Sequence, residues 1–185
     1  MKTLLAFLLL LPALAAEPSE EKIDLGSGRA AVVTLPGDWK RNALSLATAG
    51  TGTAEFSTRN GSNDSLLLTF VPMRNDQMND PASFRAMAEI APRRFMDGSV
   101  ERQVVLKEFK FRGRTGYECR FTDAKLVGQP TVPGDYKTMT CHYVYLGDRV
   151  LLAATIFSDD PDGEGYATAR KIMQSLTLSL PQNTI

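Results

Sequence analysis

The sequence has a single histidine, His142, and this scarcity excludes several classes of enzyme. A zinc site with several imidazole ligands cannot form. A Ser-His-Asp arrangement would have to use His142, and no Gly-x-Ser-x-Gly motif presents a serine to it. We therefore favour a histidine that is packed or hydrogen-bonded within a strand, and we keep a small hydrolase that uses His142 as an alternative function.

Motifs for redox, nucleotide and metal chemistry are also missing. Cys119 and Cys141 lack Cys-x-x-Cys spacing, and Gly26-Ser27-Gly28 is not followed by a third glycine or a Lys-Ser/Thr pair. The acidic stretch 158–164 follows the calcium-loop pattern at its start, but the closing bidentate position falls on Ala169. We predict no catalytic residue, no metal and no cofactor.

Charge is balanced, with 21 basic and 21 acidic side chains. Such a chain has no global field to attract nucleic acid or anionic lipid. There is no internal repeat, and no run beyond the N-terminus is apolar enough to cross a membrane. The length suits one compact domain.

The N-terminus has the three parts of a secretory signal peptide. Lys2 supplies a positive charge, Leu4 to Leu11 an apolar run too short to span a bilayer, and Ala13-Leu14-Ala15 a cleavage site. We predict a signal peptide over residues 1–16 and a periplasmic or secreted protein. A flexible leader is expected over 17–29 and a single domain over 30–180.

The run from Thr115 to Phe157 predicts three consecutive antiparallel strands that contain both cysteines. Opposing Cys119 to Cys141 also opposes Tyr117 to Tyr143, so the register matches apolar residues on one face. In an oxidising compartment this placement favours a disulfide between Cys119 and Cys141. The alternative is a pair of buried thiols.

The turn after the second of these strands contains a Gly147-Asp148 pair, which suits a two-residue hairpin loop. With these two residues as the loop, Tyr145 opposes Val150 and Cys141 opposes Ala154. On the face opposite the cysteines, the residues of these strands are a mixture of polar and apolar side chains. We therefore expect both faces of the sheet to be covered.

Other elements follow from local patterns. Asp80-Pro81 predicts a helix start, and Pro92 predicts that this helix ends near Ala91. A second helix is expected to bury Tyr166, Ala169, Ile172, Met173 and Leu176. Strands are expected at 30–35, 44–48, 53–58, 65–73 and 104–112, with a short extended tail at 176–180. Trp39 is expected to close one edge of the core.

Two regions are candidates for binding. Residues 93–120 hold eight basic and four acidic side chains, and the strand end at Arg112 and Arg114 is the most basic point. The loop from Lys125 to Asp135 is rich in glycine and proline, as exposed binding loops are. The candidate surface therefore comprises Arg112, Arg114, Lys125, Gln129 and Asp135, although solvated basic side chains would give the same pattern.

The order of these elements resembles the PsbP-like domain, which is shared by the PsbP proteins of photosystem II and the Ran-binding Mog protein. The resemblance rests on the strand that runs into Pro36-Gly37-Asp38-Trp39, the helix after Asp80, the meander through Tyr117 and Tyr145, and the closing stretch 169–178. It implies an α+β fold, an antiparallel β-sheet flanked by helices in an α/β/α sandwich. It also implies a binding or assembly module without catalysis.

These observations together predict an exported, non-catalytic binding or assembly module of the bacterial envelope. Its partner is expected to be a protein or an envelope component, not nucleic acid. The alternatives are the small periplasmic hydrolase with His142, an inhibitor or immunity-type protein, and a structural envelope protein without a dedicated ligand.

Overall fold

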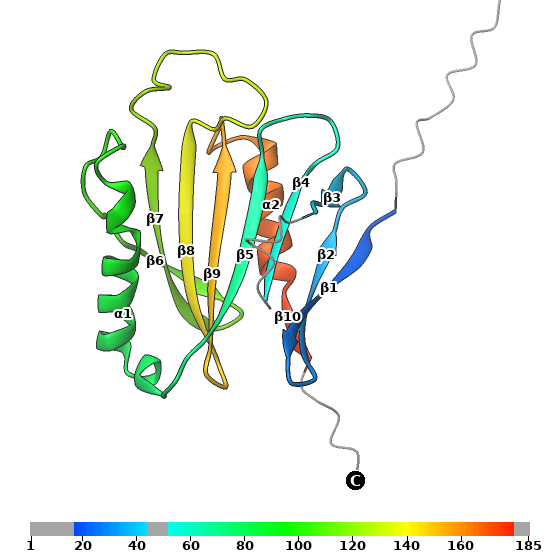
Figure 1. Cartoon of the computed structure of the whole chain (residues 1–185), viewed down its shortest axis with the longest axis vertical. Coiled ribbons are helices and arrows are strands. Elements are labelled where there is room, and N and C mark those ends of the chain that lie inside the picture. The colour runs from blue at the N-terminus through cyan, green and yellow to red at the C-terminus, as the bar shows by residue number, and fades with distance from the viewer. Residues whose placement is uncertain (1–16, 44–51, 180–185) are drawn as a thin grey trace, which may run out of the picture.

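The computed structural model describes residues 17–43 and 52–179, which form two antiparallel sheets and two α-helices (Figure 1). The predicted signal peptide and the predicted strand at 44–48 lie outside the described residues. The elements are β1 (Ser19–Gly26), β2 (Arg29–Leu35), β3 (Trp39–Arg41), β4 (Thr53–Thr58), β5 (Ser65–Pro72), η1 (Gln77–Asn79), α1 (Pro81–Ile90), η2 (Ala91–Phe95), β6 (Lys107–Phe111), β7 (Arg114–Thr122), β8 (Thr138–Gly147), β9 (Val150–Ser158), α2 (Glu164–Ser175) and β10 (Thr177–Ser179).

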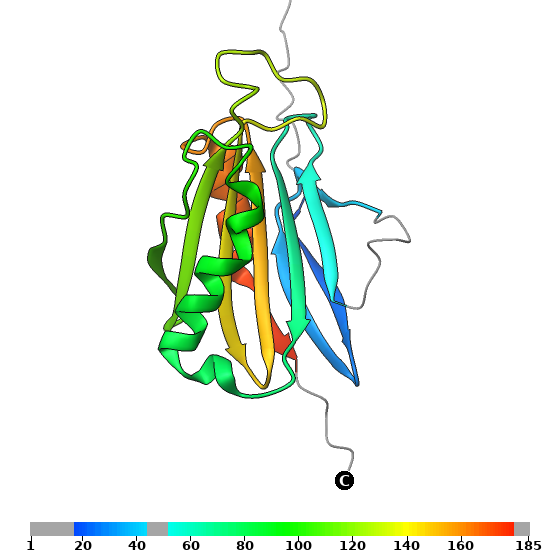
Figure 2. The same cartoon turned by 60° about the vertical axis from the view of Figure 1, so that its left-hand side comes forward.

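The large sheet has seven strands in the order β3-β4-β5-β9-β8-β7-β6, and the small sheet has three in the order β1-β2-β10. Helix α1 lies over one face of the large sheet, while α2 lies over the other face and also contacts β2 of the small sheet (Figures 1 and 2). The α+β class is confirmed. The large antiparallel sheet flanked by helices is as predicted, and the structure adds a second, three-stranded sheet, which lies beside α2.

Strand β1 replaces the flexible leader predicted at 17–29. It pairs along its length with β2, and only Ile23 is fully buried, at 1% exposure. Its neighbours Lys22 and Asp24 face solvent. Besides Ile23, only Leu25 of this strand packs against the core. Two apolar positions are too weak a pattern to predict a strand, since alternation needs several apolar residues to be recognised.

The register of β7 with β8 is confirmed. Cys119 lies opposite Cys141, Tyr117 opposite Tyr143, and Phe121 opposite Met139. Nearly all of β8 is buried, so both of its faces are covered, as expected. The α1 face packs the cysteines with Phe84 and Ala88 of α1.

The register of β8 with β9 was predicted wrongly. The loop consists of Asp148 and Arg149, which have φ values of 49° and 58°, and a bulge lies between Tyr145 and Gly147. Cys141 therefore opposes Thr155, and Ala154 opposes His142. Positive φ at both central residues is the geometry of a tight hairpin turn, and the extra residue in the bulge shifts the pairing.

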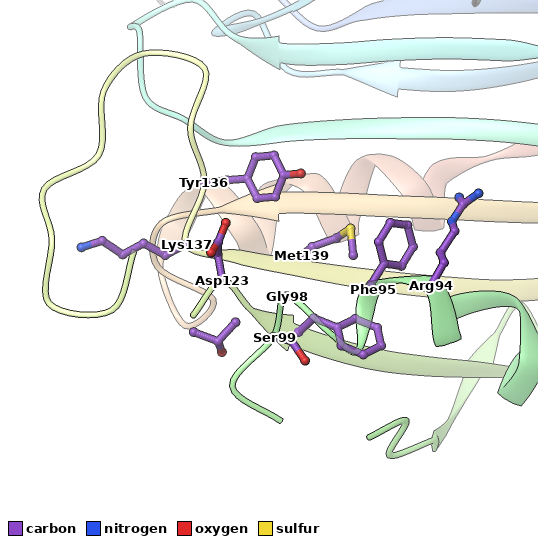
Figure 3. A pocket seen from close by; sticks show the side chains of 10 residues that line it. Arg94, Phe95, Gly98, Ser99, Asp123, Tyr136, Lys137 and Met139 are labelled. Carbon is purple, nitrogen blue, oxygen red and sulfur yellow. The ribbon is translucent and has the colours of Figure 1, made fainter. Parts of the chain in front are cut away.

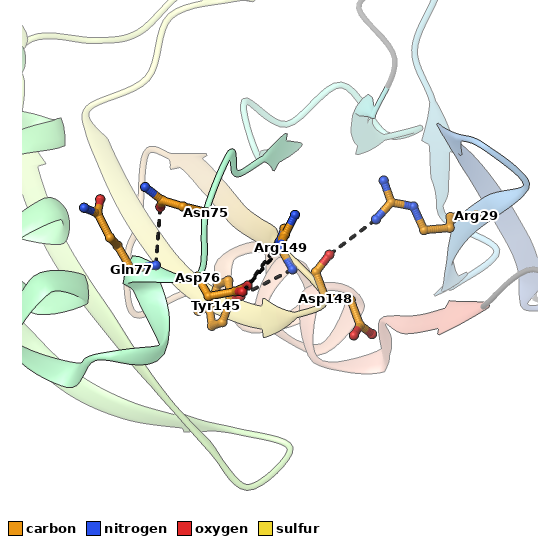
Figure 4. A network of polar contacts seen from close by, with 7 residues as sticks. All are labelled: Arg29, Asn75, Asp76, Gln77, Tyr145, Asp148 and Arg149. Carbon is orange, nitrogen blue, oxygen red and sulfur yellow. Dashed lines mark hydrogen bonds and ion pairs between the residues drawn. The ribbon is translucent and has the colours of Figure 1, made fainter.

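Contacts from three parts of the chain meet at this turn (Figure 4). Nε of Arg149 lies 3.2 Å from Oδ1 of Asp76, and its backbone N–H donates to the hydroxyl of Tyr145 at 3.3 Å. Arg29, at the start of β2, donates from Nη1 to the carbonyl of Asp148 at 3.4 Å. The turn thus links the large sheet to the small one.

Helix α1 begins and ends where the sequence predicts. Asp80 is the N-cap and accepts a hydrogen bond from the backbone N–H of Ser83 at 2.8 Å, with Pro81 at the first helical position. The α-helix stops at Ile90, and the chain continues through Pro92 as a 3₁₀ turn. Within the described ranges, no helix has the length and hydrophobicity needed to cross a membrane.

Two further predictions concern the core. Trp39 is 2% exposed and packs in the core between the large sheet, α2 and the small sheet, which confirms that it closes this part of the core. The strand predicted at 104–112 is observed as β6, which is shorter and begins at Lys107.

Candidate functional site: the cavity beside the loop 123–137

The loop 123–137 connects β7 to β8 at one end of the large sheet (Figure 1). Side chains from other elements hold it. Asp159, directly after β9, accepts hydrogen bonds from Thr131 Oγ1 and from the backbone N–H of Lys137. Asn63 donates to Asp159 at 2.9 Å and accepts from the backbone N–H of Gly134 at 3.2 Å. These contacts fix the second half of the loop, at residues 131, 134 and 137.

The electrostatics of Asp159 agree with this anchoring role. Burial acts to raise the pKa of its carboxyl group, but hydrogen bonds from Thr131, Asn63 and the backbone of Lys137 together lower the pKa. The carboxylate is charged at neutral pH and accepts all of these bonds.

A cavity of about 230 Å³ lies next to the base of this loop (Figure 3). Phe95, Phe121 and Met139 form its apolar wall, and the rings of Phe95 and Phe121 are 6.0 Å apart. Arg94 and Lys137 lie at opposite ends of the cavity in the view of Figure 3, with Asp123 between them. An apolar wall with a charged rim suits an apolar side chain of a partner.

The aromatic residues around the cavity are held by neighbouring groups. The guanidinium of Arg94 lies 4.6 Å from the ring centre of Phe95. Tyr136 packs on Phe157 of β9, with ring centres 4.3 Å apart. The wall is thus built from η2, β7, β8 and the end of the loop, which are adjacent only in the fold.

The predicted binding residues do not form one surface. Lys125, Gln129 and Asp135 lie on the loop 123–137, but Arg112 and Arg114 lie at the other end of β7, about 25 Å away at the usual rise of a strand. Arg112 also has a structural role, because its Nη1 donates to the carbonyl of Leu176 at 3.1 Å at the C-terminus of α2.

The sequence did not single out the residues that hold the loop and line the cavity. Asn63 receives no role from the sequence, and Asp159 enters only as part of the acidic stretch 158–164. Arg94 stood out only as one of several basic residues. No local pattern marks these residues, because their contacts cross sequence separations as large as 96 residues.

His142 is buried on the α2 face, with 1% of its surface exposed. Its Nε2 lies 3.3 Å from Oε2 of Glu118, and the same oxygen lies 3.3 Å from Nη2 of Arg170. Burial lowers the pKa of His142, whereas contact with the imidazole lowers the pKa of Glu118. A substrate cannot reach the imidazole, so the geometry does not favour the hydrolase.

Cys119 and Cys141 are both free and buried, so the predicted disulfide is corrected to a pair of thiols. The register prediction was right and the bond prediction was not. Strand pairing decides which residues face each other, but a disulfide also needs a specific approach and torsion of the two sulfurs. Hydrogen bonding to Cys141, together with burial, raises the pKa of the Cys119 thiol.

In the described part of the chain, no group of three or more histidine, cysteine, aspartate or glutamate residues is placed to hold a metal ion. The acidic stretch after β9 has a structural arrangement. Ser158 donates to Asp64 at 2.6 Å, and the backbone N–H of Asp162 donates to Asp160 at 3.0 Å. These bonds order the connection into α2.

No protein-family model matches the sequence, and no curated protein matches it. Among solved structures, the cyanobacterial PsbP protein CyanoP from Synechocystis sp. PCC 6803 is similar, with a TM-score of 0.54 and 11% identity over 89% of this chain and 94% of that one. The Ran-binding protein Mog1p of Saccharomyces cerevisiae aligns with a TM-score of 0.49 and 9% identity over 86% of this chain and 95% of that one. The similarity to CyanoP confirms the predicted resemblance at the level of architecture: the chain has a PsbP-like fold.

Proposed function

We propose that this protein is an exported, non-catalytic binding module of the bacterial envelope, and that the loop 123–137 with the adjacent cavity contacts its partner. The observation that carries the proposal is that the loop is fixed by Asp159 and Asn63 yet presents apolar side chains to solvent. Val127 is 58% exposed and Val132 is 60% exposed. A fixed loop with exposed apolar groups is typical of a contact surface.

The anchoring bears directly on binding. Ordering a loop on association costs conformational entropy, and a loop that is already held by hydrogen bonds loses less of it. The cavity beside the loop offers an apolar wall of Phe95, Phe121 and Met139 to a side chain of the partner. Arg94 and Lys137 outnumber the one carboxylate, Asp123, around the cavity, and this favours a partner with acidic residues near that side chain.

A comparison of loop variants tests the contact surface. The full mature chain is used as bait in the exported fraction, beside a Val127→Asp/Val132→Asp variant and a control, Val105→Asp, in which a valine that is 51% exposed is changed outside the loop. We expect a partner that both the wild-type chain and the control retain and that the loop variant loses. Retention by all three baits, or no partner for any of them, would overturn the proposal.

Export has a separate test. The N-terminal pattern with Lys2, the apolar run from Leu4 and Ala13-Leu14-Ala15 supports cleavage after residue 15 or 16. We expect mass spectrometry of the protein from the producing cell to give a mature chain that begins at Ala16 or Glu17. A chain that keeps residues 1–15 would contradict export by this route.

A further inference from the structure

A second concave site lies at the opposite end of β7 from the loop 123–137. It has a volume of about 400 Å³, and its apolar part consists of Phe111, Leu146, Leu176 and Leu178. Phe111 and Leu176 are each 2% exposed, so the floor of the site belongs to the core. The rim carries two guanidinium groups, those of Arg112 and Arg114.

The charge in this site has one sign. No acidic residue lines it. Arg112 is occupied by the carbonyls of Ser175 and Leu176, at 3.4 Å and 3.1 Å. Arg114 is exposed, and in the described part of the chain no ion pair or hydrogen bond engages its guanidinium. It lies beside Gly147, where a side-chain Cβ would be 3.5 Å from its Nη1. One planar cation is therefore available for an anionic group.

The site is also bordered by a free strand edge. Strand β10 pairs only with β2 among the described strands. No residue of β2 lines the site, whereas residues of β10 and of the β6–β7 turn do. Because β2 occupies one side of β10 and contributes nothing to the lining, the opposite edge of β10 is the one that a strand lying in the site could reach. Such an edge offers N–H and C=O groups to a further strand.

We propose that this site binds the C-terminal end of an extended peptide. The peptide adds as a strand to the free edge of β10, its terminal carboxylate pairs with Arg114, and its last side chain, which is apolar, enters the space between Leu146 and Leu178. The fork of a guanidinium matches a carboxylate with two parallel hydrogen bonds. Because β10 has only three residues, its backbone can form few hydrogen bonds with the peptide. The pairing of the carboxylate with Arg114 therefore contributes a large share of the affinity.

The alternative ligand for this site is a fatty acid, which also combines a carboxylate with an apolar chain. It would use Arg114 and the apolar floor, but it has no donors or acceptors for the edge of β10. The free edge therefore favours the peptide. This site is separate from the loop surface of the proposed function, so the two can succeed or fail independently.

The test uses a fluorescein-labelled hexapeptide of alternating threonine and valine that ends in isoleucine with a free carboxylate. Its affinity for the mature chain is measured by fluorescence anisotropy, beside the same peptide as a C-terminal amide. The variants are Arg114→Gln and a control, Arg74→Gln, which changes an exposed arginine outside the site. Dodecanoate serves as the competing probe. Amide resonances of Thr177, Leu178 and Ser179 are followed by NMR in the same samples.

We expect the free carboxylate peptide to bind at least about tenfold more tightly than the amide, since a charge-assisted bidentate pair is lost with the amide. Arg114→Gln should weaken binding by a similar factor, Arg74→Gln should not, and the β10 amides should shift. Equal affinity of the two peptides, an unchanged affinity in Arg114→Gln, or binding by dodecanoate without the peptide would overturn the proposal.

Discussion

The two faces of the large sheet differ in the polarity of the residues that they bury. The α1 face is apolar where β8 crosses it, with Met139, Cys141 and Tyr143 packed under Phe84. The α2 face carries Thr140 and His142 on the same strand, and both are at most 2% exposed. One strand therefore supplies an apolar contact surface on one side and a buried polar group on the other.

The difference teaches how a polar residue is tolerated in this core. The imidazole of His142 lies beside Glu118, and Arg170 of α2 compensates the negative charge of Glu118. Helix α2 also contacts both sheets, which makes its face the larger core. We expect the α2 face to dominate stability and to carry most of the pH dependence.

The largest expected effect comes from two adjacent leucines of β9 on opposite faces. Leu152 is fully buried in the α2 core, and Leu151 is 5% exposed on the α1 side. Leu152→Ala should lower the free energy of unfolding by about 4 kcal/mol, and Leu151→Ala by about 2.5 kcal/mol. Urea denaturation measures both. Equal losses, or a larger loss for Leu151, would break the comparison between the faces.

The next effect concerns Glu118, whose side chain is 18% exposed. Glu118→Gln removes the negative charge between His142 and Arg170, and we expect a loss of about 2 kcal/mol in unfolding free energy at pH 7. The matched control is Glu108→Gln, because Glu108 is 53% exposed and pairs with Lys110 at 3.3 Å. That change should cost about 0.5 kcal/mol or less. Similar losses for the two variants would show that the buried cluster adds nothing special.

The pH dependence should come from the same face. Burial lowers the pKa of His142 below its ordinary value of 6.5, so the unfolded chain takes up a proton before the folded one does. Stability should therefore fall as the pH drops below about 6.5. Glu118, whose pKa is lowered from 4.5, adds a further loss at more acidic pH. Unfolding free energies at pH 7.5 and 5.5 test this, and a His142→Gln variant with an unchanged difference between them would exclude His142 as the cause.

The smallest global effect is expected at Asp159, which lies outside both cores. Asp159→Asn weakens the hydrogen bonds that hold the loop 123–137, so we expect about 1 kcal/mol or less in global unfolding but faster hydrogen exchange in the loop. Asp162→Asn is the control, since Asp162 is exposed and its backbone N–H bonds to Asp160 of the same turn. Unchanged exchange in the Asp159 variant would mean that the loop is ordered by other contacts.

The predictable parts of the fold are those in which one stretch of sequence contains the whole signal. Helix α1 follows from Asp80, Pro81 and Pro92, because capping and the missing proline N–H act within one turn. The β7–β8 register follows from the apolar match around the two cysteines. The bulge near Leu146 was not predictable, since several one-residue shifts keep apolar residues opposite one another in strands as buried as β8 and β9.

The candidate sites show the same division. The loop residues Lys125, Gln129 and Asp135 were identified from glycine and proline content, and they do lie on an exposed loop. The cavity could not be identified from the sequence, because Phe95, Phe121 and Met139 come from three elements that meet only in the folded chain. The charge pattern predicts Arg112 as a binding residue, whereas in the structure its guanidinium donates to the carbonyl of Leu176 at the end of α2.

By itself, the sequence determined the α+β class, most strands and both helices, and the pairing of β7 with β8, because propensity, capping and alternation act over a few residues. Only the tertiary structure decided that residues 19–26 add a strand, that Cys119 and Cys141 remain thiols, and that Arg112 and Arg114 lie far from the loop. These outcomes depend on how distant segments pack together, and a local pattern carries no information about that packing.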